Sequence, residues 1–228
     1  MAAVPVPVCT LLPLRLLRAA NVARIPDDLT DREAAAVPEA YITAHDAVFT
    51  RAELVLGETL LVNGASGGVG TAAVQLGVAA GVRVLANARS HREALTVLGA
   101  EPCLLSEARG VDVVLELVGA ANLPGSLEAL ASRGRIIVVG TGAGADAELS
   151  LRALMGRRAT LMGTVLRARP MEEKAAAVQA FARSVVPHLA AGRVRPVIDR
   201  VFPVSEAAAA FDHLASPGKF GKVLLELT

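Results

Sequence analysis

The sequence predicts an α/β fold with a doubly wound parallel sheet. Short apolar segments alternate with helical segments through the middle of the chain, and glycine marks most of the boundaries between them. Strands that alternate with helices favour right-handed crossovers and parallel pairing. The chain has 228 residues, of which 53% are hydrophobic, so it has ample material for a core.

Two helices are expected ahead of the sheet. Thr30 and Glu33 have the spacing of a capping box, which predicts a short helix through Val37. A second helix is expected from about Tyr41 to Phe49.

The sheet is expected to begin at residues 59–63, an apolar run that Gly57 and Gly64 bound as they would a buried strand. Further strands are predicted at residues 82–86, 111–117, 135–139 and 159–165, with helices at 67–80, 91–98 and 123–131. The pattern then changes to one long helix over 171–191, followed by strands at 197–202 and 222–227 around a helix at 205–214.

A glycine-rich turn follows the first strand and reads A-x-G-x-x-G, at Ala65, Gly67 and Gly70. In the dinucleotide-binding fingerprint of Rossmann folds, the middle glycine lets the backbone approach a pyrophosphate and the last lets the helix pack closely on the strand. The N-terminus of the helix offers free N–H groups to the phosphates. The alternative is a turn without a ligand, but the flanking strand, helix and second strand are the context that the fingerprint requires.

The end of the second strand indicates which dinucleotide binds. NAD sites place an acidic residue here for the ribose 2′-hydroxyl, whereas a nearby arginine suits a 2′-phosphate. The chain has no acid at this point and instead has Arg89, Ser90 and Arg92. NADP(H) is therefore favoured as the cofactor, the alternative being that these arginines are only a solvated helix start.

The turn belongs to an ordered set of motifs. Leu61-Val62-Asn63-Gly64-Ala65-Ser66-Gly67-Gly68-Val69-Gly70 is followed by Ala73-Val74-Gln75-Leu76. Around it, in order, stand Ala35-Ala36-Val37-Pro38, Thr43-Ala44, Gly99-Ala100, Gly110-Val111-Asp112-Val113-Val114, Val118-Gly119, Gly134-Arg135-Ile136-Ile137-Val138-Val139-Gly140 and Gly221-Lys222-Val223-Leu224. Over about residues 21–227 the chain resembles the zeta-crystallin-type NADPH:quinone oxidoreductases, in the zinc-free branch of the medium-chain dehydrogenase/reductase superfamily.

The resemblance implies a cofactor site assembled from distant parts of the chain. The pyrophosphate would lie against the turn, at Ala65, Ser66, Gly67, Gly68, Val69 and Gly70. The nicotinamide would lie near Thr43, and the 2′-phosphate among Arg89, Ser90 and Arg92. The remaining contacts would come from Val118, Gly140, Thr141 and, near the outer end of the cofactor, Lys222. A homodimer would form through the edge strand Ala159 to Val165, which would also hide an exposed apolar strand.

The chain also departs from the family pattern. Family members carry an N-terminal GroES-like domain that covers the nicotinamide, and only its last fragment is expected here. Three parts are therefore expected: a remnant of that catalytic domain with a linking helix (1–50), a Rossmann dinucleotide-binding domain (51–170) and a C-terminal helix with returning strands (171–228). The stretch between Cys103 and Gly110 is also shorter than in the family, on the adenine side of the cofactor.

Composition argues against several other classes of protein. Aromatic residues make up only 3% and the net charge is +1, so a nucleic-acid partner is not expected. No apolar run reaches the roughly 18 residues of a membrane span. The apolar residues 1–20 contain three prolines and are not expected to be a targeting peptide. Two isolated cysteines indicate a reducing compartment, and a cytoplasmic location is expected.

Three further sets of side chains offer other chemistry. His45, His91, His188 and His213 lack metal-ligand spacing, so no metal is expected, and His45 is expected to be a surface or satisfied helix residue. Glu116 and Asp112 are expected to be structural strand-end residues. Ser66 also stands in a G-x-S-x-G arrangement typical of a hydrolase nucleophile, with Asp199 and His213 available as partners. The Rossmann interpretation is preferred because it also explains Gly70 and the second strand.

Two functions remain. The first is an NADPH-dependent enzyme that transfers hydride to a quinone or an α,β-unsaturated carbonyl, with no catalytic residue assigned. The second is a truncated, non-catalytic NADPH-binding module that acts as a sensor, a subunit or a remnant.

Overall fold

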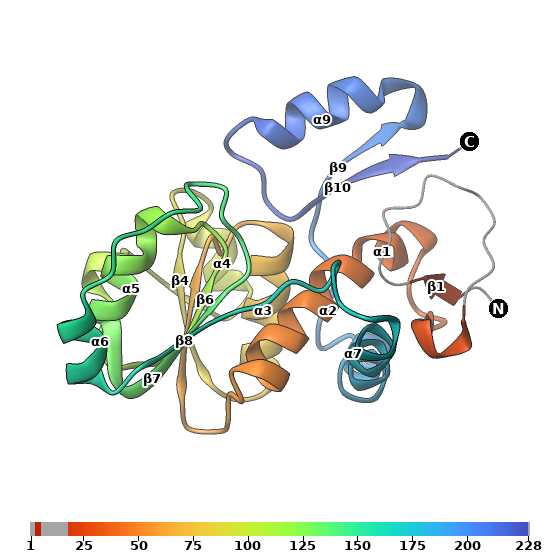
Figure 1. Ribbon diagram of the computed structural model, residues 1–228. Helices are drawn as coiled ribbons and strands as arrows, with labels where there is room; N and C mark the ends of the chain where they lie inside the picture. The colour runs from red at the N-terminus through yellow and green to blue at the C-terminus, as the bar shows by residue number, and fades with distance from the viewer. Residues whose placement is uncertain (1–2, 6–17, 228) are drawn as a thin grey trace.

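The computed structural model describes residues 3–5 and 18–227. Most of the apolar stretch considered above as a targeting peptide lies outside these residues. Within them, a six-stranded sheet is flanked on both faces by helices, and a smaller unit made of α9, β9 and β10 stands beside it (Figure 1).

The central sheet is entirely parallel, with strand order β5-β4-β3-β6-β7-β8. Its strands are β3 (Thr59–Asn63), β4 (Arg83–Asn87), β5 (Glu101–Cys103), β6 (Val111–Glu116), β7 (Leu130–Val138) and β8 (Thr160–Gly163). The chain order reverses between β3 and β6, and ligands of such sheets bind at the carboxyl ends of the strands beside this point.

Successive side chains of β3 point to opposite faces of the sheet and pack into two separate hydrophobic cores. Leu60 and Val62 of β3 pack with α3 (Gly68–Ala79) and α4 (Arg92–Val97) on one face. Leu61 packs with α5 (Leu123–Ala129) and α6 (Leu151–Arg157) on the other. Because helices cover both faces, the central residues of β3, β4 and β6 are apolar on both sides of the sheet, and the doubly wound α/β fold is confirmed.

The segments before the sheet also fold as helices. The antiparallel pair β1 (Ala3–Pro5) and β2 (Val22–Arg24), with η1 (Ala19–Asn21) between, precedes α1 (Asp31–Ala36) and α2 (Pro38–His45). The predicted capping box of α1 is confirmed, since Thr30 Oγ1 accepts from the Glu33 N–H and Glu33 Oε2 from the Thr30 N–H. A π-helical turn, η2 (Asp46–Arg51), continues α2 and carries the rest of the second predicted helix.

The single helix predicted over 171–191 is wrong. The chain forms α7 (Met171–Ser184) and α8 (Val186–Ala190), with Val185 between them. Pro187 is the reason, because proline has no N–H to continue the helical hydrogen bonds and fits only the first turn of a new helix.

Other boundaries differ from those predicted. β7 begins at Leu130, inside the helix predicted to reach residue 131, and its pairing with β6 is irregular between Val111 and Val113. Gly134 therefore lies within a strand rather than before it. The sequence patterns also gave no indication of β1, β2, β5 and α6. The remaining short turns are η3 (Leu105–Glu107), η4 (Ala120–Asn122) and η5 (Val204–Glu206).

The C-terminal unit is a second, small parallel arrangement. β9 (Ile198–Pro203) and β10 (Lys222–Glu226) pair in parallel, and α9 (Ala207–Ala215) connects them. The segment that enters β10 returns to the main sheet, because Gly221 forms an isolated parallel bridge with Gly67. The start of β10 thus lies against the turn after β3.

Candidate functional site

The glycine turn lies at the carboxyl end of β3 and leads directly into α3. Gly64 has φ +79°, a conformation that favours glycine. Gly67 caps α3, where its N–H donates to the Gly64 carbonyl at 3.1 Å and its carbonyl accepts from the Thr71 N–H at 2.8 Å. The first N–H groups of α3 have no partner within the helix, as at any helix start.

Two glycines of the turn meet very different surroundings. A Cβ on Gly70 would lie 2.3 Å from the Gly64 carbonyl oxygen and 2.7 Å from Ala65 Cα, so no side chain fits. A Cβ on Gly67 would meet nothing nearer than 3.5 Å, and Gly67 is exposed. Gly70 therefore serves packing within the turn, whereas Gly67 presents bare backbone to the outside.

A cation from the C-terminal unit lies over the same turn. The Gly221 N–H donates to the Ser66 carbonyl at 2.9 Å, which fixes the start of β10. The aliphatic stem of Lys222 covers Gly68, and its Nζ donates to Glu39 Oε2 of α2 at 2.6 Å. A positive charge that was predicted only by resemblance thus stands at the opening of α3.

The loops after β6 and β7 border the turn on its other side. A Cβ on Gly64 would lie 3.2 Å from Val118 Cγ2, and one on Gly119 would lie 2.8 Å from Thr141 Cα. A Cβ on Gly140 would lie 2.3 Å from the Leu117 carbonyl oxygen. Val118, Gly140 and Thr141 are therefore gathered beside the turn. Thr43 lies half-buried on α2, which packs along α3.

The residues predicted for the 2′-phosphate follow β4, next to the turn. Arg89 is exposed, and among residues 18–227 no side-chain hydrogen bond or ion pair engages it. Arg92 donates to the Pro102 carbonyl at 2.9 Å, so its guanidinium already has one partner on β5. Ser90 is half-buried.

His91, which the sequence patterns did not assign to this site, joins that segment to the C-terminal unit. It has φ +62°, its ring centroid lies 5.1 Å from that of Phe220, and Nε2 is 2.9 Å from the Gly218 carbonyl. A positive φ is uncommon outside glycine. No local pattern signals this contact, since the partners are 127 residues apart.

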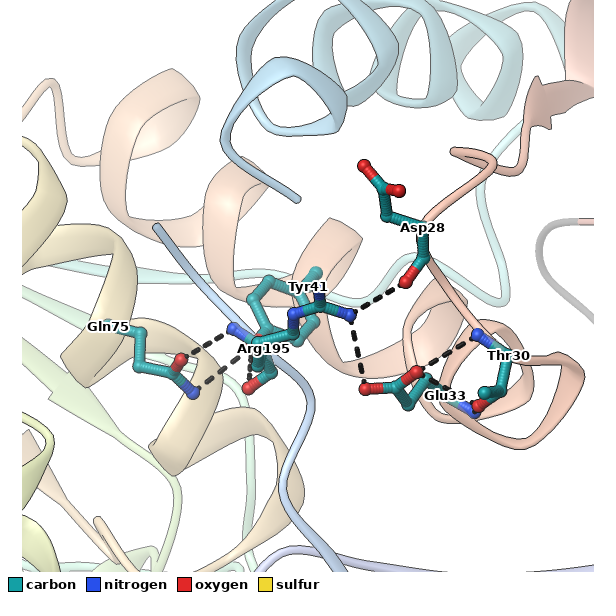
Figure 2. A network of polar contacts seen from close by, with 6 residues as sticks. All are labelled: Asp28, Thr30, Glu33, Tyr41, Gln75 and Arg195. Carbon is teal, nitrogen blue, oxygen red and sulfur yellow. Dashed lines mark hydrogen bonds and ion pairs between the residues drawn. The ribbon is translucent and has the colours of Figure 1, made fainter. Parts of the chain in front are cut away.

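A buried network of hydrogen bonds, called the clamp below, joins Tyr41 of α2 and Gln75 of α3 to Arg195 (Figure 2). Arg195 lies in the segment between α8 and β9. Tyr41 Oη donates to the Arg195 carbonyl at 2.9 Å, and the Arg195 N–H donates to Gln75 Oε1 at 2.8 Å. Gln75 Nε2 also donates to Tyr41 Oη at 3.1 Å. Burial raises the pKa of the Tyr41 hydroxyl, so it remains a hydrogen-bond donor. The main chain of Arg195 is thereby held at both its N–H and its C=O.

The same arginine reaches outward to the start of α1. Its Nη1 donates to the Asp28 carbonyl at 3.0 Å and lies 3.3 Å from Glu33 Oε1, the capping-box carboxylate (Figure 2). The hydrogen bonds from Thr30 hold the pKa of Glu33 below its usual value, with Arg195 adding to that effect. Gln75 and Tyr41 were not predicted as partners, because the third member lies over a hundred residues away.

The hydrolase arrangement is not assembled. Asp199 and His213 do pair, with Oδ2 2.6 Å from Nε2, and the His213 ring lies against Phe202. In the part of the chain that the structure describes, no hydrogen bond joins this pair to Ser66. Asp199 instead accepts from the Phe220 N–H at 2.9 Å, which supports the segment that leads to the glycine turn.

Three further features bear on the kind of site. His45 is buried and stacks on Phe49 at 5.6 Å, so it is a packed helix residue; burial lowers its pKa. Across residues 3–5 and 18–227, no three His, Cys, Asp or Glu side chains are grouped so that they could hold a metal ion. The helices described here include none with the length and apolar character to cross a membrane.

Comparison with known proteins agrees with this geometry. The family model for zinc-binding dehydrogenases matches residues 84–225. A quinone oxidoreductase from Thermus thermophilus, also solved in complex with NADPH, is 36% identical with a TM-score of 0.78, covering 91% of this chain and 70% of that one. The chain belongs to the quinone oxidoreductase group of the medium-chain dehydrogenases/reductases.

Mammalian relatives show the same similarity. The quinone oxidoreductase of Mus musculus is 33% identical over 221 residues, and that of Rattus norvegicus 35% over 219 residues. Each match covers 89% of this chain, which spans 65% of the length of either relative. The resemblance inferred from the motifs is thus confirmed at the level of the family.

Proposed function

We propose that the chain binds NADP(H) at the glycine turn and acts as a reductase of quinones or α,β-unsaturated carbonyls. The observation that carries this proposal is the turn itself, where the exposed Gly67 backbone and the open start of α3 lie beneath the stem of Lys222, whose ammonium is paired with Glu39. Backbone N–H groups and a cation at a helix start are the groups that bind pyrophosphate. The NADPH complex of the Thermus thermophilus relative supports the choice of ligand.

Each part of the cofactor has residues here that would fit it. The pyrophosphate would be held by Gly67, Gly68 and Val69 with Lys222, and Arg89 and Ser90 would take the 2′-phosphate. Arg89 is exposed, and a guanidinium is matched to phosphate oxygens. Thr43, Val118, Gly140 and Thr141 would border the ribose and nicotinamide.

The chemistry would come from the cofactor, which supplies a hydride when bound. The residues of this chain would orient it and exclude water from the cleft. We assign no proton donor and no zinc, because the histidines and cysteines are isolated in the sequence and each histidine described has a structural partner or lies apart from the turn.

The proposed organisation follows from the same parts. The sheet occupies residues 59–163, which supports a dinucleotide-binding domain over 51–170 flanked by segments 1–50 and 171–228.

A homodimer through β8 is supported by an open sheet edge and by exposed Leu161 and Val165. Sedimentation analysis tests it, and a monomer at all concentrations would exclude it. Isolated cysteines favour a cytoplasmic location.

Turnover is tested by NADPH oxidation with 9,10-phenanthrenequinone. The proposal predicts saturable, protein-dependent loss of NADPH absorbance. Tight NADPH binding without turnover of quinone or enone would instead favour the non-catalytic module.

A further inference from the structure

A buried polar cluster lies at the carboxyl ends of the central strands. Its members are Asn63 at the end of β3, Asn87 at the end of β4, Glu116 at the end of β6 and Ser126 within α5. Asn63, Glu116 and Ser126 are fully buried, and none of the four belongs to the residues proposed to touch the cofactor. Polar groups at this depth are costly unless each is hydrogen-bonded.

Glu116 is the centre of the cluster. Its Oε2 accepts from Asn63 Nδ2 at 2.6 Å and from Ser126 Oγ at 3.2 Å. Its Oε1 accepts from the N–H groups of Val118 at 2.8 Å and Gly119 at 2.9 Å. No lysine, arginine or histidine among the described residues forms an ion pair with it. The carboxylate is therefore held entirely by neutral donors, of which two belong to the loop after β6.

The main chain around the cluster fixes the neighbouring loops. The Glu116 carbonyl accepts from the N–H groups of Val139 at 2.9 Å and Gly140 at 3.2 Å, where β7 ends. Asn87 Nδ2 donates to the Asn63 side chain at 2.9 Å, and the Asn87 carbonyl accepts from the first two N–H groups of the glycine turn at 3.1 and 3.3 Å. The turn and the loops after β4, β6 and β7 thus meet at one buried node.

We propose that Glu116 is a positioning residue that sets the nucleotide affinity of the folded protein by holding the Val118–Gly119 loop beside the turn. This inference rests on the proposed function. Gly119 has φ +111°, so the loop has a conformation that its own sequence does not enforce. When a loop is already ordered before the ligand binds, less of the binding free energy is used to order it, and the affinity is higher.

The test exchanges donor and acceptor within the node. In Glu116→Gln, one side-chain atom becomes a donor and faces either Asn63 Nδ2 or the two loop N–H groups, which are donors as well. The double variant Asn63→Asp/Glu116→Gln restores a donor–acceptor pair between positions 63 and 116. Ser126 Oγ accepts from Asn63 Nδ2 at 2.8 Å in the wild type, and in the double variant its hydroxyl can rotate to donate to the new carboxylate and accept from the new amide. We expect NADPH binding, measured by calorimetry well below the unfolding temperature, to weaken about tenfold in Glu116→Gln and to recover in the double variant. Amide exchange of the Val118–Gly119 segment is expected to rise and recover in parallel.

Each outcome is informative. A lowered unfolding midpoint with unchanged NADPH affinity would show a purely structural role and overturn the inference. Weakened binding that the double variant fails to recover would also overturn it, because hydrogen-bond complementarity would not be the cause. If the wild type itself does not bind NADPH, the proposed function fails first, which distinguishes that failure from the failure of Glu116 alone.

Discussion

Gly70→Ala is the substitution whose effect the structure defines most sharply. The added methyl would lie 2.3 Å from the Gly64 carbonyl oxygen and 2.7 and 2.8 Å from two backbone atoms of Ala65. Because all three neighbours are main chain, the turn or α3 must shift. Overpacking of this kind costs about 1–3 kcal/mol, and rigid neighbours place this case at the upper end. Alanine regains up to about 1 kcal/mol through its helix propensity, which leaves a net loss of about 2 kcal/mol.

Gly67→Ala separates binding from stability. Its Cβ would meet nothing nearer than 3.5 Å and its φ is −76°, so the unfolding free energy is expected to change by less than about 0.5 kcal/mol. The methyl would nevertheless stand between the backbone and an approaching pyrophosphate, so NADPH affinity is expected to fall about tenfold or more.

Gly156→Ala in α6 is the matched control. It has open space around it and no proposed ligand, so stability should rise slightly and NADPH affinity should stay unchanged. Urea unfolding and calorimetric titration of the three variants give both quantities. The separate roles of the two glycines would be refuted if Gly70→Ala were as stable as the wild type, or if Gly67→Ala bound NADPH as tightly as the wild type.

Two further substitutions test the surrounding structure. Tyr41→Phe removes the hydroxyl between Gln75 and Arg195 and is expected to cost about 1–3 kcal/mol in urea unfolding; no loss would show that the clamp contributes nothing. The hydrogen bonds of Arg135 hold the pKa of the Glu58 carboxyl below its usual value in the folded protein. The ion pair therefore stabilises the fold at pH values above the pKa of Glu58 in the unfolded chain, and this stabilisation is lost as the pH falls through the lower pKa of the folded state. Glu58→Gln should therefore destabilise the protein by about 1–3 kcal/mol at neutral pH and converge with the wild type in acid, whereas a constant difference would contradict this.

Local patterns were sufficient for most of the sheet. The apolar runs at β3, β4 and β6 are bounded by glycines or polar residues, and burial on both faces makes them distinct, whereas β8 is an exposed edge strand whose apolar residues still predicted it. β5 has only three residues and includes Pro102, so it has no detectable periodicity. Gly134 predicts a strand boundary by its residue type, but β7 begins at Leu130 and pairs irregularly with β6, so this glycine lies inside the strand.

The residues of the candidate site also differ in how well the sequence predicts them. The glycine turn is contiguous, and its strand–turn–helix context is readable over a dozen residues. Lys222 lies 183 positions from its partner Glu39, and Gln75 lies 120 positions from Arg195. Such contacts depend on how the last strands return to the sheet. A signal for the Glu116 node was present, since Asn63, Asn87 and Glu116 each end an apolar strand, and carboxyl ends of neighbouring parallel strands lie side by side.

The dinucleotide site is tested most directly by calorimetric comparison of NADPH and NADH binding to the wild type and to Arg89→Glu. We expect one saturable NADPH site and weaker NADH binding in the wild type. In the variant, the loss of affinity for NADPH should exceed the loss for NADH by about tenfold or more, as removal of one charge-assisted phosphate contact implies. Equal losses for the two nucleotides would contradict the assignment of the 2′-phosphate to Arg89. Absence of binding to either nucleotide would contradict the central claim that the glycine turn is a dinucleotide site.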